Sequence, residues 1–141
     1  MIAIDTNVLL RYLLEDDVVQ SAKAAKLING KRQVLVTDVV LAETIWTLRG
    51  KKYQLNKAEL VSVIQALFQE PSIRFEDGQV VWMALNDYRK AKPAKGKEVD
   101  VADALIINKA KLIADRPGEK FGGSYTFDQA AQKLPGAKVP T

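Results

Sequence analysis

The chain has 141 residues, of which 48% are hydrophobic, and this suits one domain with a sizeable core. It carries 21 Lys and Arg against 17 Asp and Glu, so its formal charge of +4 suits a polyanionic partner. The absence of cysteine and histidine excludes disulfides, thiolate metal sites and any mechanism that needs an imidazole base. Catalysis must therefore rest on carboxylates, Lys, Tyr, Ser or Thr, and carboxylates favour hard cations such as Mg²⁺, Mn²⁺ or Ca²⁺.

The N-terminal segment, MIAID, lacks the basic start and the long apolar stretch of a signal peptide. No apolar run in the chain approaches the ~20 residues of a membrane span. We therefore expect a cytoplasmic protein that does not associate with a membrane.

Short apolar segments alternate along the chain with segments of helical periodicity. Strands are expected at residues 1–4, 33–36, 73–75, 123–127 and 137–139. Helices are expected from residue 8 onward and at 18–28, 38–48, 56–68, 79–88, 101–114 and 129–134, and residues 89–98 (RKAKPAKGKE) read as a basic loop. This alternation predicts right-handed βαβ units and a parallel sheet covered on both faces. In such sheets the functional crevice lies at the carboxyl ends of the strands.

Three acidic residues lie at or near such ends. Asp5 and Asp128 directly follow predicted strands, and Asp103 opens the helix 101–114. Each has an ordinary structural alternative, because Asp5 and Asp128 could cap the helices that follow them. Asp103 could likewise sit in a first helical turn behind a capping Asp100, where the helix dipole favours it.

Glu43 is a fourth acid, in a different setting. Helical spacing places it on one face with Val39 and Trp46, and a Glu on an apolar face is rarely buried without a partner. The alternative is an edge Glu that reaches solvent or pairs with a lysine. If all four acids converged, their charges would repel one another unless a divalent cation bound them. Two such ions about 4 Å apart can activate a water and stabilise the leaving oxygen of a phosphodiester.

The segments around these acids resemble the four signature blocks of PIN domains, in the same order and spacing. They are Asp5-Thr6-Asn7 with the following VLLRYLL, Glu43 within LAET, Asp103 within ADALIINKA and Asp128 within YTFD. The resemblance spans essentially the whole chain and implies one PIN domain over residues 1–141. It implies an α/β fold, a three-layer α/β/α sandwich around a mostly parallel sheet of 4–5 strands in the order 3-2-1-4-5.

The same resemblance implies the roles of the site residues. Asp5, Glu43, Asp103 and Asp128 would be catalytic and would bind Mg²⁺, for which Mn²⁺ can substitute. Thr6 would support Asp5, and Thr126 would support Asp128. Asp100 would be either an auxiliary acid or, as we favour, a helix cap.

The small single domain resembles the VapC toxins of bacterial toxin–antitoxin modules. That resemblance implies an endoribonuclease that forms a homodimer and is silenced by a VapB-type antitoxin. The basic loop could hold an RNA phosphate near Asp103, although a solvated loop is the plain alternative. The candidate RNA contacts are Arg89, Lys90, Lys92, Lys95 and Lys97, with Arg11, Arg49, Lys109 and Arg116 as further, unranked ones.

Other functions fit less well. A haloacid-dehalogenase-type phosphatase needs a second acid two residues after the first, where this chain has Asn7. Dinucleotide binding needs a glycine-rich turn after the first strand, and none is present. Two alternatives stay open: a PIN nuclease of RNA processing without an antitoxin, and a non-catalytic nucleic-acid-binding module.

The helices 38–48 and 56–68 carry more apolar residues than a small core obviously needs. We expect either a core or an exposed dimer or antitoxin surface made of Ile45, Trp46, Leu48, Leu60, Val61, Ile64 and Phe68. Burial of these side chains decides between the two interpretations.

Overall fold

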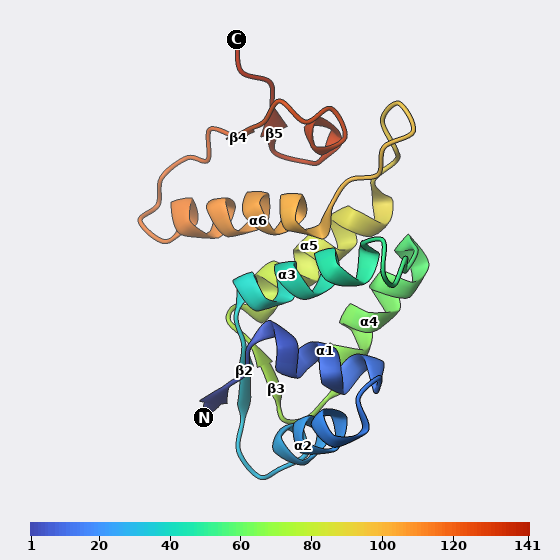
Figure 1. Ribbon diagram of the computed structural model, residues 1–141. Coiled ribbons are helices and arrows are strands. Elements are labelled where there is room, and N and C mark those ends of the chain that lie inside the picture. The colour runs from blue at the N-terminus through green and yellow to red at the C-terminus, as the bar shows by residue number, and fades with distance from the viewer. The chain divides into compact units, whose positions relative to one another are not determined.

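The computed structural model describes all 141 residues and contains two compact units, residues 1–76 and 77–141 (Figure 1). It has six α-helices, and every pair of neighbouring strands is parallel. The predicted α/β class with parallel strand pairing is confirmed. No helix combines the length and apolar character that crossing a membrane requires.

The first unit is a three-stranded parallel sheet with four helices. Its elements are β1 (Ile2–Ala3), α1 (Thr6–Leu14), α2 (Val18–Ile28), β2 (Val34–Val36), α3 (Asp38–Arg49), α4 (Lys57–Gln69) and β3 (Ile73–Phe75). The strand order is β1-β2-β3, in which Ile2 is paired with Val34 and Val34 with Ile73. This order confirms the 3-2-1 part of the predicted sheet.

Polar side chains fix where the helices of this unit begin. Asp5, Asp17, Thr37 and Asn56 precede α1 to α4, and each accepts a hydrogen bond from the backbone N–H three residues further on. An N-cap of this kind satisfies one of the free amides of the first turn and contributes about 1 kcal/mol. Asn56 and Glu59 form a full capping box at the start of α4. The sequence therefore sets these boundaries locally.

Most of the side chains proposed for an interaction surface on α3 and α4 belong to the core. Ile45, Leu48, Leu60 and Ile64 are buried, so the prediction of an exposed surface was wrong for them. Val61 and Phe68 are partly buried, and the Phe68 ring packs edge-on against Phe75 at 4.7 Å between centroids. Trp46 is the exception, because 70% of it is exposed.

The second unit contains two packed helices and a small parallel ribbon. Its elements are α5 (Gly78–Lys90), α6 (Val101–Asp115), β4 (Ser124–Tyr125), the 3₁₀ helix η1 (Ala131–Lys133) and β5 (Ala137–Lys138). Asn108 of α6 joins the helices by donating a hydrogen bond of 2.9 Å to Asp87 of α5. Strands β4 and β5, which were predicted to be neighbours, pair with each other in a sheet separate from that of β1 to β3. The β1–β4 pairing and the three-layer arrangement, which would join the two units, stay predictions.

The basic segment 89–98 is only partly a loop. Arg89 and Lys90 lie in the last turn of α5, where positive charge is favourable near the helix C-terminus. Ala94 and Lys97 pair across a two-residue turn whose residues, Lys95 and Gly96, have φ of 51° and 77°. Both values are positive, as a hairpin turn of type I′ requires.

Candidate functional site

The first pair of candidate acids lies at the start of α1 and on α3. Asp5 follows β1 and caps α1, since its Oδ1 accepts a hydrogen bond of 3.0 Å from the Val8 backbone. Thr6 Oγ1 donates a hydrogen bond of 3.0 Å to Glu43 Oε2. The residue next to Asp5 therefore holds the Glu43 carboxylate, and both carboxylates are exposed to solvent. Thr6 was expected to support Asp5, and its hydrogen bond is to Glu43 instead.

The face of α3 that carries Glu43 is exposed. Val39 and Trp46 share this face and are 65% and 70% exposed, so the face is not buried and the alternative of a Glu43 that reaches solvent is confirmed. The core face of α3 is the stripe of Leu41, Ile45 and Leu48. Glu43 is thus open to a ligand, with apolar side chains on either side of it along the helix.

Asp103 and Asp100 are joined at the beginning of α6. Asp103 Oδ2 accepts a hydrogen bond of 3.2 Å from the Asp100 backbone N–H, and the Asp103 N–H donates one of 3.1 Å to the Asp100 carbonyl. Asp100 is the N-cap residue of α6, as we favoured. The first-turn interpretation of Asp103 is confirmed, and the N-terminal end of the helix dipole stabilises its negative charge.

Asp128 accepts hydrogen bonds at both of its carboxylate oxygens. Its Oδ1 accepts hydrogen bonds from the backbone N–H of Ala130 and Ala131 at 2.9 and 3.2 Å. Its Oδ2 accepts one from Lys97 Nζ at 3.0 Å. The hydrogen bond from Lys97 is the main cause that lowers the pKa of Asp128, and the Ala131 N–H adds to it. Thr126 Oγ1 accepts from the Asp128 backbone N–H at 3.0 Å, so Thr126 does contact Asp128.

The donor set fits a hard divalent cation. Within neither unit does a group of three or more acidic side chains gather. Asp5 and Glu43 lie in the first unit and Asp103 and Asp128 in the second, and Mg²⁺ is typically held by one or two carboxylates with waters on its other positions. The available donors are all oxygens, and Asp128 already pairs with a cation, the Lys97 ammonium. That pair also engages Lys97, one of the five basic residues proposed to hold RNA.

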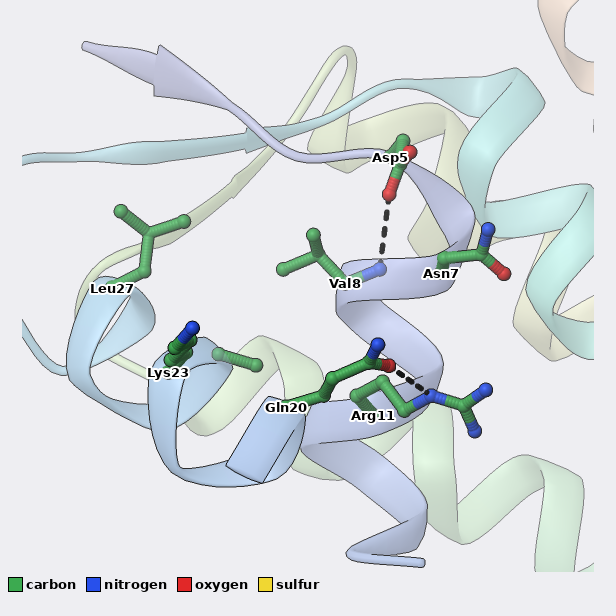
Figure 2. Close-up of a pocket in the computed structure, with 8 residues that line it drawn as sticks. Asp5, Asn7, Val8, Arg11, Gln20, Lys23 and Leu27 are labelled. Atoms are coloured by element: carbon green, nitrogen blue, oxygen red, sulfur yellow. Dashed lines mark hydrogen bonds between the residues drawn. The ribbon is translucent and has the colours of Figure 1, made fainter. Parts of the chain in front are cut away.

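A pocket beside Asp5 was not foreseen from the sequence. It lies between α1 and α2 and is lined by Asp5, Asn7, Val8, Arg11, Gln20, Lys23, Ala24 and Leu27 (Figure 2). Arg11 was among the unranked basic candidates, but Gln20 and Lys23 were missed. Their helical spacing, three residues apart on α2, was the available signal.

Comparison with known proteins assigns the chain to a family. No curated protein matches it. The family model of the PIN domain matches residues 2–116, a range that contains Asp5, Glu43 and Asp103 and ends before Asp128. PIN domains are generally nucleases, that is hydrolases of phosphodiester bonds, and they generally use divalent metals. Since the match covers most of the sequence, the chain belongs to the PIN domain family.

Proposed function

We propose that the protein is a Mg²⁺-dependent endoribonuclease and the toxin of a VapBC-type toxin–antitoxin module. In this proposal residues 1–141 act as one PIN domain, and Asp5, Glu43, Asp103 and Asp128 converge on one site. The observation that carries it is the PIN match over residues 2–116, which contains three of the four acids. The Thr6–Glu43 hydrogen bond supports it, because it links two sequence blocks that lie 37 residues apart.

The chain's own residues would divide the work of hydrolysis. When bound, the metal supplies a Lewis acid that lowers the pKa of the hydrolytic water and stabilises developing charge on the phosphate. Asp5 would hold it with the oxygen that does not cap α1, and Glu43 with a carboxylate oriented by Thr6. Asp103 and Asp128 would complete the site with carboxylates positioned at the starts of α6 and η1. The ion pair between Lys97 and Asp128 would break when the metal binds.

The exposed apolar side chains next to Glu43 favour a protein partner as well as RNA. Trp46 and Val39 lie on the same face of α3 as Glu43, and both are largely exposed. Exposed aromatic residues beside a functional group are typical of interface anchors. A VapB-type antitoxin that covers the acids would bury them, as would part of a homodimer contact.

An activity assay with Asp5→Asn tests the metal-dependent nuclease. The amide keeps the size of the side chain and can still cap α1, but it removes a charged metal ligand. We expect cleavage of single-stranded RNA to fall on the order of a thousandfold while the thermal melt stays unchanged. EDTA should stop cleavage, and Mg²⁺ or Mn²⁺ should restore it.

The matched control is Asp115→Asn at the exposed end of α6, which should leave activity unchanged. Asp16 also lies outside the four blocks, but it is unsuitable as a control. It pairs with Arg11 at 3.0 Å, and Arg11 lines the pocket beside Asp5.

The chemistry of the cut ends provides the stricter test. A chain without histidine has no imidazole to drive the RNA 2′-hydroxyl into its own phosphate. Hydrolysis by water should therefore leave a 5′-phosphate and a 3′-hydroxyl. Cyclic phosphate ends, or cleavage that survives EDTA in protein free of contaminating ribonuclease, would falsify the proposal.

The toxin assignment has its own test. A toxin gene should be followed or preceded by a short reading frame for an antitoxin, and the co-expressed product should bind the chain and stop cleavage. Trp46→Ala should weaken that complex at least tenfold if Trp46 anchors it, a loss of about 1.4 kcal/mol. If the protein encoded by the neighbouring reading frame does not affect cleavage, the toxin assignment is wrong, and the alternative of a PIN nuclease in RNA processing applies.

A further inference from the structure

The pocket between α1 and α2 joins the candidate active site to a second hollow. The pocket has a volume of about 310 Å³, with Asp5 at one end and the apolar side chains of Val8, Ala24 and Leu27 in its walls. A volume of ~300–1,000 Å³ with apolar walls and a few polar groups is usual for small-ligand sites. Figure 2 shows Asp5 above Val8 on the α1 side and Leu27 and Lys23 on the α2 side.

The adjoining hollow is strongly basic. It has a volume of about 380 Å³ and shares Lys23 and Leu27 with the pocket beside Asp5. Its charged lining consists of Lys23, Lys26, Lys31 and Arg32, and it has no acidic residue. All four side chains are exposed, and none of them forms a salt bridge.

Four unpaired cations around one hollow repel one another, which is unfavourable in the absence of a ligand. A polyanion relieves this repulsion and releases its own condensed counterions when it binds. A strand of nucleic acid carries phosphates at regular intervals, so it could occupy the hollow and the pocket with one continuous backbone.

The pocket itself favours a single unstacked base over a duplex. Arg11 Nε donates a hydrogen bond of 2.9 Å to Gln20 Oε1, which fixes the orientation of the Gln20 amide. The Gln20 Nε2 group then lies on the side of Val8 and Asp5, as Figure 2 shows, where it can donate to a base. Single-stranded RNA is usually recognised through splayed bases that stack on aromatic or Arg side chains and are read at their edges. This pocket offers a base the Arg11 side chain and the apolar walls of Val8 and Leu27.

We propose that single-stranded RNA leaves the candidate active site along α2, with one base in the pocket between α1 and α2 and the backbone over the basic hollow. The proposal rests on the ribonuclease function argued above and adds to it the path of the substrate. Gln20 would be a specificity-determining residue, since its amide donates to an acceptor atom of the base next to the scissile phosphate. Lys23 stands between the base and the backbone positions, as it lines both spaces.

Fluorescence anisotropy in EDTA tests the path without any cleavage. The probe is a short fluorescein-labelled single-stranded RNA of mixed sequence, titrated with the full chain at several KCl concentrations. The test variant combines Lys23→Gln, Lys26→Gln, Lys31→Gln and Arg32→Gln, and the control combines Lys51→Gln, Lys52→Gln, Lys120→Gln and Lys138→Gln. Both variants remove the same charge from exposed positions, and their thermal melts are compared with that of the wild type.

The salt dependence separates the outcomes. If three of the four cations contact phosphates, the slope of log K against log salt should become shallower by about 2 in the test variant. The control should keep the slope of the wild type. An unchanged slope in the test variant, or the same change in both variants, would overturn the path along α2.

Two further arms address the occupant. Gln20→Leu should alter which nucleotide flanks the cut and weaken binding of single-stranded RNA but not of an RNA duplex, and equal effects on both would overturn the base pocket. Poly-glutamate is the probe for an acidic protein partner. If poly-glutamate displaces the labelled RNA as effectively as unlabelled RNA does, RNA is not the specific occupant and the proposal fails. A wild type that binds RNA with the expected slope but never cuts it with Mg²⁺ would contradict the nuclease function and leave the path standing.

Discussion

The hydrogen bond between Thr6 and Glu43 makes a sharp prediction about metal binding. Thr6→Val keeps the β-branched shape of the side chain and removes only its hydroxyl. The Asp5 cap on α1 should persist, because it involves the Val8 backbone and not Thr6. The variant therefore frees the Glu43 carboxylate without changing any proposed ligand.

The size of the effect follows from the geometry. A hydrogen bond to a charged group contributes ~1.5–3 kcal/mol, and the exposure of Glu43 places this one at the lower end. A loss of about 1.4 kcal/mol in the orientation of one ligand corresponds to a tenfold weaker affinity for Mg²⁺. The free energy of unfolding should fall by only about 0.5 kcal/mol, because water can solvate the released carboxylate.

The assay is a Mg²⁺ titration of RNA cleavage, accompanied by urea unfolding. Thr6→Val should raise the half-saturating Mg²⁺ concentration about tenfold, and Thr6→Ser, which retains the hydroxyl, should behave as the wild type. Glu43→Gln should be nearly inactive at every Mg²⁺ concentration. A Thr6→Val enzyme with the metal dependence of the wild type, beside an inactive Glu43→Gln, would refute the orienting role of Thr6.

Two further predictions concern stability. Tyr12 donates a hydrogen bond of 2.7 Å to Glu70, and burial together with this bond raises its pKa from 10.0 to about 12. The folded state thus keeps the Tyr12 proton longer than the unfolded state does, so this stabilisation is complete below pH 10.0 and is lost as the pH rises to about 12. Tyr12→Phe should lower the free energy of unfolding, measured by urea melts, by about 1 kcal/mol at neutral pH. It should also reduce the fall of that free energy at alkaline pH, and an unchanged fall would contradict this role of Tyr12. Asn108→Ala removes the hydrogen bond that the buried Asn108 of α6 donates to Asp87 of α5. The free energy of unfolding, measured by thermal melts, should fall by about 2 kcal/mol. A loss below about 0.5 kcal/mol would show that this hydrogen bond does not hold the helices together.

Much of the local structure could be predicted from the sequence because its causes are local. The helix 18–28 and the strand 73–75 have the predicted bounds. Helix α3 ends one residue later than the predicted helix 38–48. Side-chain caps such as Asp5 and Asn56 act within three residues, and the alternation of apolar and helical segments suffices for the parallel α/β class. Asp5, Asp103 and Asp128 were identified by their positions at strand ends and a helix start, and Glu43 by its place on an apolar helix face, which are also properties of the linear order.

Predictions were less accurate where two local patterns were equally good. Helix α3 carries apolar side chains on two stripes, and the spacing from Val39 to Trp46 matches that from Leu41 to Leu48. Only packing against the rest of the unit decided that the second stripe is buried and that Glu43 lies on the exposed one. The predicted interaction surface failed for the same reason.

The contacts that define the candidate site depend on tertiary structure alone. Thr6 and Glu43 are 37 residues apart, and Lys97 and Asp128 are 31 apart, so no periodicity relates them. The pocket beside Asp5 is lined by residues of both α1 and α2, including Gln20 and Lys23, so it exists only once the two helices pack together. The composition alone specified a basic protein without histidine, because the sign of a charge is a property of the residue. Chain packing decided which of the cations line one hollow, because the neighbours of a side chain are a property of the fold.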